Sequence, residues 1–375
     1  MTAVRFSSDS PVSIPSTEEE KVSWLRLIRS HRVGVVTFFR LIREHGTASA
    51  ALEALPDVAS KAGVQHYSAV SCQAAHQEMQ AARSCGAQMI CFGEPHYPSL
   101  LTKISDPPPV IWAIGNAALL NRPSAAIVGA RNASSLGTRM AKKLATDLGK
   151  AGYTIVSGLA RGIDTAAHTA ATASGTVAVF GGGVDVVYPK ENTALAHLIQ
   201  KEGCIISEAA IGQYPQARHF PSRNRIVSGM TRATIVVEAA AKSGSLITAQ
   251  TALDQSRDVL AVPGHPFDAR ASGCNFLLRD GATLVRSAED VIEAIGPALI
   301  AQPDHQSAPE RALEAAPDMH QLHTDILARL GPSPIAEDQL IRDLSLPAPV
   351  IAPALVTLEL DGYIARHPGG LLTLA

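Results

Sequence analysis

Between residues 125 and 296, short apolar runs rich in β-branched residues alternate with longer helical segments. The runs contain few polar side chains, which is typical of parallel strands buried on both faces of a sheet. The segments between them favour helix; Thr165 to Ala173, for example, is rich in alanine. This alternation predicts an α/β fold with a doubly wound sheet. The expected strands are Ala126–Val128, Thr154–Val156, Val177–Phe180, Ile205–Ser207, Thr234–Val237 and Val259–Val262, with Ala282–Val285 at an edge.

Ahead of this region, residues 18–86 carry apolar side chains at spacings of three and four, as in Trp24 and Ile28. This spacing predicts a small helical domain of the SAM or helix-hairpin-helix kind. The sequence LPDV at residues 55–58 replaces the glycine-rich hairpin of a DNA-binding module, so a packing or partner role is an equally open interpretation. Residues 1–17 are rich in serine and proline, and we expect them to form a disordered tail.

Residues 87–296 are expected to form the main domain, and its first part is the proline-rich segment Tyr97 to Asn116. The prolines at 107 to 109 cannot donate ladder hydrogen bonds, which favours an extended strap laid over a neighbouring element. Trp112 and Ile114 are then expected to hold this strap on the core.

Prolines recur through residues 297–317, which is typical of a linker. Residues 318–375 then show three helical segments and a hairpin between Tyr363–Ala365 and Leu371–Thr373, which is the pattern of a winged helix. Winged helices that read DNA carry basic or amide side chains on the third helix. The third segment, Pro347 to Asp361, has no Lys, Arg, Asn or Gln, so it predicts packing and a protein surface instead of a second DNA site.

The chain of 375 residues has a formal net charge of −2, with 46% hydrophobic and 18% charged residues. These values indicate a globular protein and argue against one that coats nucleic acid indiscriminately, but they are compatible with a local basic groove. The sequence contains no apolar run long enough for a membrane span and no signal-peptide pattern at its start, so we expect a cytoplasmic protein. Its five cysteines lack metal-binding spacing and are expected to be reduced packing residues.

Glycine and basic residues recur where the predicted strands end. Ligands of parallel sheets bind outside the carboxyl ends of the strands, where glycine lets the backbone approach and helix N-termini offer free N–H groups. The basic residues therefore favour a site for an anionic ligand. The alternative is that each glycine merely closes a turn and the basic residues are solvated surface residues. The strand ends in question carry Gly129 to Arg131, then Ser157, Gly158, Arg161 and Gly162, then Gly181 to Gly183 with Lys190.

The familiar phosphate-binding motifs are missing at these ends. The sequence GARNASSLG after the first strand is not G-x-G-x-x-G, Ser157 stands where a dinucleotide site needs an acid, and no P-loop motif occurs. The nucleophile motif G-x-S-x-G is also absent. His168 follows Asp164 by four residues on one predicted helix, a spacing more typical of a cap and packing pair than of a catalytic base. We therefore expect no cofactor and no catalytic residues.

A basic segment precedes the fifth predicted strand. Residues 217 to 233 contain no Asp or Glu. Arg side chains bind phosphate and stack on bases, and the aromatic ring of Phe220 can also stack on bases. One or two of these arginines could pair with carboxylates elsewhere in the fold. Together with Arg131, Arg161 and Lys190 they favour a polyanion with successive phosphates. The arginines are Arg218, Arg223, Arg225 and Arg232.

These motifs resemble the bacterial DNA-processing protein A family, also called Smf. The resemblance runs from Tyr97 to about Val285 and includes AIVGARNASSLG, VSGLARGID, GGGVDVVYPKEN, FPSRNRIVSG and GCNFLLRDGA. It implies an extended Rossmann-like domain that binds single-stranded DNA without catalysis. It further implies a homodimer that protects incoming DNA and loads a RecA-type recombinase in natural transformation. The terminal domains resemble accessory domains of some members in shape only.

The resemblance also implies which residues contact DNA. Ala130 departs from the family pattern, which usually has Ser there, and this removes one hydroxyl but leaves Arg131 in place. The implied contacts are Arg131, Ser157, Gly158, Arg161, Gly162, Lys190, Asn192, Arg223, Asn224 and Arg225, beside which Phe220 supplies an aromatic surface.

An enzymatic alternative comes from the same sheet, which also resembles that of nucleotide-cleaving phosphoribohydrolases. Their signature P-G-G-x-G-T-x-x-E would lie on the loop after Val237. That loop reads EAAAKSGSLIT, with one glycine and no trailing acid, so the sequence favours binding over hydrolysis.

Overall fold

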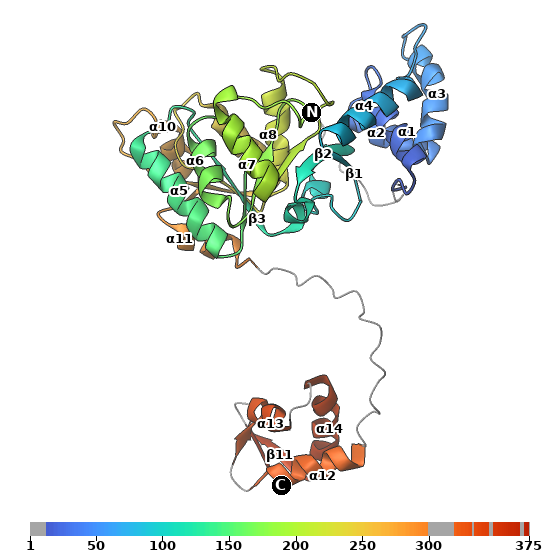
Figure 1. The fold of residues 1–375 in the computed structure, drawn as a ribbon. Coiled ribbons are helices and arrows are strands. Elements are labelled where there is room, and N and C mark those ends of the chain that lie inside the picture. Colours follow the sequence, from blue (N-terminus) through green and yellow to red (C-terminus); the bar gives the residue numbers. More distant parts are fainter. Residues whose placement is uncertain (1–12, 299–318, 332–333, 345–347, 368–370, 375) are drawn as a thin grey trace. The chain divides into compact units, whose positions relative to one another are not determined.

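The computed structural model describes residues 13–298, 319–331, 334–344, 348–367 and 371–374. Contacts among them separate two compact units, one before and one after residues 299–318. Figure 1 shows the first unit as a sheet covered by helices, with a smaller helical domain at its side, and the second as a small domain of helices and a β-hairpin. Most of the predicted tail and linker falls outside the described residues, so those two predictions stay untested.

Four helices form the N-terminal domain, in line with the spacing of its apolar residues. The first helix begins with a capping box: the Thr17 hydroxyl accepts a hydrogen bond from the Glu20 N–H, and the Glu20 carboxylate accepts one from the Thr17 N–H. Trp24, Phe38 and Phe39 are buried and meet edge to face, so the core of this domain is aromatic. The helices are α1 (Glu18–Arg29), α2 (Val35–His45), α3 (Ala48–Lys61) and α4 (Cys72–Ser84).

A nine-stranded sheet forms the centre of the first unit, in the order β1-β2-β6-β5-β4-β3-β7-β8-β9. The strands from β6 to β9 in this order run parallel. The six predicted apolar runs form β3 to β8, and the predicted edge segment contains β9, so the doubly wound sheet is confirmed. The strands are β1 (Gln88–Cys91), β2 (Val110–Gly115), β3 (Ser124–Val128), β4 (Thr154–Ser157), β5 (Thr176–Val179), β6 (Cys204–Ser207), β7 (Ala233–Val236), β8 (Asp258–Ala261) and β9 (Thr283–Leu284).

The predicted strap before β3 is wrong in its second half, because Val110–Gly115 is strand β2 and pairs antiparallel with both β1 and β6. The run of prolines ends at Pro109, so every residue of β2 keeps its N–H for the ladder. Trp112 and Ile114 are buried as strand residues and not as pins of a strap. Strand β1 was missed altogether, because it begins with the exposed, polar Gln88 and is not one of the continuous buried apolar runs by which the other strands were recognised.

Helices cover both faces of the sheet. Successive strand residues point to opposite faces, so Ile127 packs in one apolar core with α5 and α6, and Val128 packs in another with α8 and α9. None of these helices, nor any other within the described ranges, combines the length and the apolar character of a membrane span. The helices are α5 (Ser135–Lys150), α6 (Ile163–Ala171), α7 (Thr193–Glu202), α8 (His219–Gly229), α9 (Gly244–Asp254), α10 (Ser272–Arg279) and α11 (Ala288–Ile295).

The second unit is a winged helix, as the sequence predicted. Its described helices enclose a small apolar core that includes Ile326, Leu340 and Leu355. A three-stranded sheet in the order β10-β12-β11 forms the wing, although the turn around Gly370 lies outside the described residues. The elements are α12 (Met319–Arg329), β10 (Ile335–Ala336), α13 (Glu337–Leu344), α14 (Ala348–Leu360), β11 (Ile364–His367) and β12 (Leu371–Leu374).

Candidate nucleic-acid interface

A groove lies at the carboxyl ends of the parallel strands, where β3 and β7 are neighbours but the chain leaves them in opposite directions. Such a switch point is where ligands of doubly wound sheets bind. The groove has a volume of about 910 Å³ and is lined by the loops after β3, β4 and β7 and by the start of α8. A second hollow of about 470 Å³ shares Arg131, Gly158 and Phe220 with it and extends over the loop after β5.

Phe220, the second residue of α8, is the centre of this surface. The guanidinium carbons of Arg131 and Arg223 lie 5.4 and 5.9 Å from the centre of its ring, and the Tyr188 ring lies 5.7 Å away at a tilt of 38°. Tyr188 is 51% exposed and Tyr214, on the same hollow, is 76% exposed. Aromatic rings next to guanidinium groups on an open surface can stack on planar ligands.

Three of the predicted cations are exposed on these hollows. In the part of the chain that the structure describes, no carboxylate lies within ion-pair distance of Arg131 or Lys190. Arg161 lies 3.8 Å from Glu191, and both side chains are more than 60% exposed, so solvent weakens this pair. The positive charge of all three residues is therefore available to an anion.

Arg223 is placed differently, because its side chain is buried beneath the groove. Its Nη1 donates to the carbonyl oxygens of Gly158 and Val179, both at 2.6 Å. Burial lowers the pKa of Arg223 to about 10, so the guanidinium still carries its charge at neutral pH. A Cβ atom at position 158 would come within 2.2 Å of Nη1. Gly158 is thus needed for Arg223 to hold the loop after β4 against β5.

Arg225 belongs to an internal ion-pair cluster. Its side chain is only 12% exposed; Nε lies 3.2 Å from the Asp106 carboxylate, and Nη2 pairs with the Glu208 carboxylate. Burial raises the pKa of Glu208, although the charge of Arg225 opposes that shift. Asn224 lies between the two arginines in sequence and accepts a hydrogen bond of 3.1 Å from Arg223 Nε.

Ser157, Asn192 and Gly162 hold the loops in place. The Ser157 hydroxyl is buried and donates to the carbonyl of Ile127 at 2.6 Å. The Asn192 amide, at the end of the 3-10 turn Lys190–Asn192, donates to the carbonyl of Leu159 at 2.8 Å. Gly162 has a φ of 79°, and a Cβ atom there would lie 2.2 Å from the carbonyl oxygen of Ala130. These residues fix the geometry of the surface that carries the exposed cations.

His168 and Asp164 are both buried below the loop after β4. Asp164 accepts hydrogen bonds from the N–H groups of Gly158 and Ala160, and His168 Nδ1 lies 2.7 Å from the Thr176 hydroxyl. Burial lowers the pKa of His168 to about 3. The imidazole therefore stays neutral and out of reach of a ligand, as expected of a packing pair.

Sequence reasoning missed Tyr188, Tyr214, Lys242 and Glu238, which also lie at this edge. Tyr188 could have been found from its place between the triple glycine and Lys190, because that loop had to reach the same edge as Arg131. Tyr214 and Lys242 lie in irregular loops whose path the sequence does not define. Glu238 is notable because its carboxylate binds the Ser134 N–H and hydroxyl at the start of α5.

Comparison with known families agrees with the geometry. A parallel sheet with a groove at its switch point places the chain among Rossmann-like α/β proteins. Residues 88–296 match the profile of the DNA recombination-mediator protein A family, residues 18–81 that of the DprA-like N-terminal HHH domain, and residues 307–370 that of the DprA winged helix domain. The chain belongs to the DNA recombination-mediator protein A family, so the resemblance seen in its motifs is confirmed.

Several relatives share much of the chain. Protein Smf of Synechocystis is 33% identical over 75% of this chain and 79% of its own length. DNA processing protein DprA of Streptococcus pneumoniae is 45% identical over 52% of this chain and 70% of its own length. The solved structure of the S. pneumoniae protein has a TM-score of 0.57 at 36% identity and covers 66% of this chain and 82% of that chain. A Helicobacter pylori DprA structure, which concerns the single-stranded DNA binding mode of that protein, has a TM-score of 0.51 at 28% identity. It covers 55% of this chain and 95% of that chain.

Proposed function

We propose that this protein binds single-stranded DNA, without sequence preference, along the groove at the switch point. The observation that carries the proposal is the arrangement of Phe220, flanked by Arg131 and Tyr188, inside a groove rimmed by exposed cations. Unpaired bases expose faces that can stack on aromatic and guanidinium groups, while the phosphates meet Arg161 and Lys190. A duplex hides the faces of its bases, so it would use only the charges.

In this proposal the residues implied by the motif resemblance have two roles. Arg131, Arg161, Lys190 and Phe220 touch the DNA, while Gly158 and Gly162 allow the close packing of the loops that carry them. Their positions depend on Ser157, Asn192, Asn224, Arg223 and Arg225, which bind protein atoms beneath the surface.

We further propose that the bound strand is incoming DNA in natural transformation, which the protein protects and passes to a RecA-type recombinase while acting as a homodimer. The names of the relatives as DNA processing proteins and the subject of the H. pylori structure support this proposal. Assembly of a RecA-type recombinase on protein-coated single strands, followed by light scattering, tests the loading step. Molar mass from light scattering after gel filtration tests the homodimer.

The proposal assigns no catalysis. The phosphoribohydrolase alternative needs a nucleotide phosphate at the switch point, but the Glu238 carboxylate binds the start of α5, where such folds hold phosphate. His168 is buried and uncharged. Incubation with nucleoside monophosphates is expected to release no free base, and release would favour the enzymatic alternative.

The decisive experiment is a salt-dependent binding series with fluorescent oligonucleotides. We expect single strands of any sequence to bind more tightly than duplexes, with an affinity that falls as salt rises. The expected slope is about −0.7 per neutralised phosphate on a log-log plot. Equal affinity for duplex and single strand, or binding that ignores salt, would overturn the proposal.

A further inference from the structure

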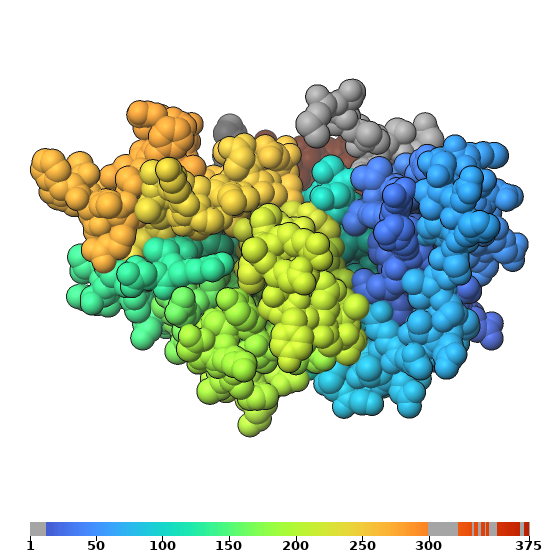
Figure 2. All heavy atoms as spheres, turned by 90° about the horizontal axis from the view of Figure 1, so that it is seen from above, coloured from blue at the N-terminus to red at the C-terminus, as the bar shows by residue number. Residues whose placement is uncertain are grey.

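One wall of the groove is a segment without regular secondary structure. Glu208 to Arg218 connects β6 to α8 and brings Tyr214 and Pro215 to the surface beside Phe220. Such a segment has no ladder or helix of its own, so its position depends on contacts from other elements. Figure 2 shows the N-terminal domain (blue) beside the yellow-green part of the chain that includes this segment.

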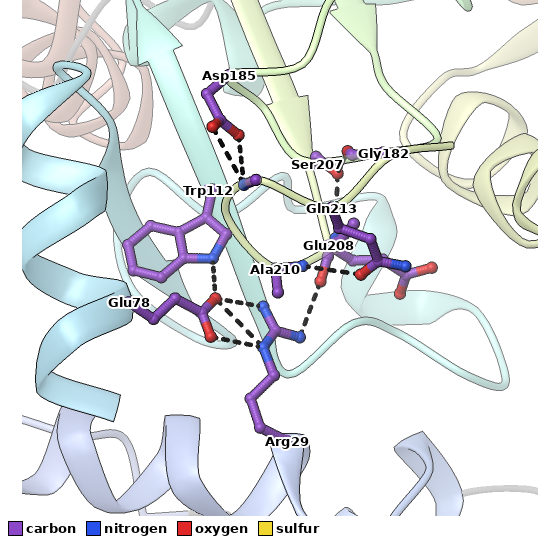
Figure 3. A network of polar contacts seen from close by, with 11 residues as sticks. Arg29, Glu78, Trp112, Gly182, Asp185, Ser207, Glu208, Ala210 and Gln213 are labelled. Atoms are coloured by element: carbon purple, nitrogen blue, oxygen red, sulfur yellow. Dashed lines mark hydrogen bonds and ion pairs between the residues drawn. The ribbon is translucent and has the colours of Figure 1, made fainter. Parts of the chain in front are cut away.

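The N-terminal domain supplies one of these contacts. Nη1 of Arg29, the last residue of α1, donates a hydrogen bond of 3.1 Å to the carbonyl oxygen of Glu208 (Figure 3). The rest of the guanidinium is committed to Glu78 on α4, with Nη2 at 2.8 Å and Nε at 3.0 Å from its carboxylate oxygens. Glu78 in turn accepts a hydrogen bond of 3.0 Å from Trp112 Nε1 in β2. The fork of Arg29 is thereby oriented, so that its remaining nitrogen points at Glu208.

The connection continues from Glu208 to the aromatic centre of the groove. The Glu208 carboxylate pairs with Arg225, and Arg225 lies on α8 together with Phe220 and Arg223. On its other side the segment is held by Asp185, whose carboxylate accepts a hydrogen bond of 2.9 Å from the Gly212 N–H. Among the described contacts of residues 208–218, Arg29 donates the only hydrogen bond from the N-terminal helices.

The cations near this junction argue against a second DNA site on the N-terminal domain. Lys21 pairs with Glu94, Arg83 pairs with Glu18, and Arg26 Nε donates to the carbonyl of Val70 at 2.9 Å. The side chain of Arg29 is 19% exposed and that of Glu78 is 13% exposed, so both are mostly shielded from solvent. The charges of Lys21, Arg26 and Arg29 therefore act within the protein, whereas the Arg83–Glu18 pair is mostly exposed, at 62% and 59%.

We propose that Arg29 is a positioning residue for DNA binding, through which the N-terminal domain holds the wall of the groove. This inference rests on the proposed function, since it assigns the N-terminal domain a role in that same site. The residue touches no DNA; it sets the place of Glu208 and, through Arg225, of α8. Loss of Arg29 therefore weakens binding without removing a phosphate contact.

The test uses the full chain with Arg29→Ala, and with Arg83→Ala as the matched control. Both changes remove one positive charge from the N-terminal domain, but the ion pair that the described structure gives Arg83, with Glu18, lies within that domain. Arg29→Ala is expected to weaken single-stranded DNA binding about five- to tenfold, at the lower end of the roughly 5- to 150-fold range typical of coupling between distant groups, with an unchanged log-log salt slope. Arg83→Ala should stay within twofold. A flatter slope in Arg29→Ala would mean that Arg29 itself neutralises a phosphate, and a wild-type affinity would mean that it positions nothing; either result overturns the inference.

Hydrogen exchange provides a second readout that does not require DNA. Amides of residues 208–220 are expected to exchange faster in Arg29→Ala than in wild type and Arg83→Ala, because the segment loses a contact. Unchanged exchange there would refute the positioning role even if affinity fell. If the wild type binds no single-stranded DNA, the proposed function fails, and exchange still decides whether Arg29 holds the segment. Arg29→Lys, which keeps the charge but lacks the planar fork, is measured in the same way should Arg29→Ala fail to fold.

Discussion

The carboxylate of Glu238, just after β7, accepts a hydrogen bond of 2.9 Å from the backbone N–H of Ser134 at the start of α5. The two residues are far apart in sequence and meet across the switch point. A Cβ atom at Gly137 would lie 2.3 Å from the Glu238 carboxylate carbon, so a glycine is required for this approach. The protein thus places its own anion at the positive end of a helix dipole, where related folds hold a phosphate.

Glu238→Ala should therefore cost stability. We expect the free energy of unfolding to fall by about 1 kcal/mol, the usual effect of losing a helix cap, and Glu238→Gln should lose less because its amide oxygen can still accept. Urea unfolding followed by tryptophan fluorescence measures this, since Trp24 and Trp112 both lie in the first unit. Glu202→Ala, at the exposed end of α7, is the control. Equal stability of Glu238→Ala and wild type would show that the contact between Glu238 and Ser134 contributes nothing to stability.

The arginines of the basic segment should differ from Arg131 in their effect on salt dependence. Arg131→Ala is expected to reduce the slope of the salt plot by about 0.7, because Arg131 is exposed, has no carboxylate within ion-pair distance among the described residues, and can therefore neutralise one phosphate. Arg225→Ala should lower affinity and stability but leave the slope unchanged, because Asp106 and Glu208 already balance its charge. Titrations at four or more salt concentrations separate these outcomes. A reduced slope in Arg225→Ala would mean that this residue exchanges its carboxylates for DNA.

Lys190 is expected to act through charge alone. It is exposed at the start of the 3-10 turn after β5, with Asn192 fixing the turn beneath it. Lys190→Arg should keep most of the affinity for single-stranded DNA, whereas Lys190→Glu should abolish binding by repelling the phosphates. Lys201→Glu, on the exposed end of α7, controls for the change in net charge. Normal binding by both Lys190 variants would place this residue outside the interface.

Much of the fold could be predicted because its signals are local. The six buried strands are continuous apolar runs, and each could be recognised without knowledge of its neighbours. Strand β2 was misjudged because Pro107 to Pro109 suggested a segment without ladder bonds, and only the pairing with β6 reveals a strand immediately after them.

The candidate site was predictable in composition but not in the roles of its residues. Sequence could show that arginines gather before β7, but it could not show which of them meet carboxylates. Arg225 pairs with Asp106, more than one hundred residues earlier, and such long-range partners leave no local pattern. The same holds for Arg29 and Glu208, which lie on different domains of the first unit.

The buried His168 should make the first unit sensitive to acid. Its pKa is lowered by burial to about 3, whereas the unfolded chain takes up the proton near the ordinary value of 6.5. Between these two values the unfolded state binds more protons, so stability falls as the pH drops from 6.5 towards 3. His168→Gln removes this titration. We expect the loss of unfolding free energy between pH 7 and pH 5 to be smaller in the variant than in wild type; equal losses would show that His168 does not contribute.

Removal of the winged helix should leave DNA binding almost intact. In winged helices that read DNA, the third helix carries basic or amide side chains into the major groove. Here α14 presents exposed apolar side chains, Val356 at 51% and Leu360 at 82%, and its charged residue is Glu359, which pairs with Arg366 of the wing. This apolar surface offers no favourable interaction with phosphates. Deletion of residues 318–375 is therefore expected to change single-stranded DNA affinity by about 1 kcal/mol or less, which corresponds to a few-fold change in the dissociation constant.

The deletion is informative only if the remaining chain keeps its fold and its oligomeric state, so circular dichroism and light scattering accompany the binding series. The first unit has its own apolar cores and its own contacts, which supports folding without the second. A matched variant, Leu360→Glu in the full chain, adds a negative charge to α14 and should leave affinity unchanged for the same reason. A hundredfold loss in the folded deletion variant, or a marked loss in Leu360→Glu, would show that the winged helix contacts DNA through groups other than the cations that such helices normally use.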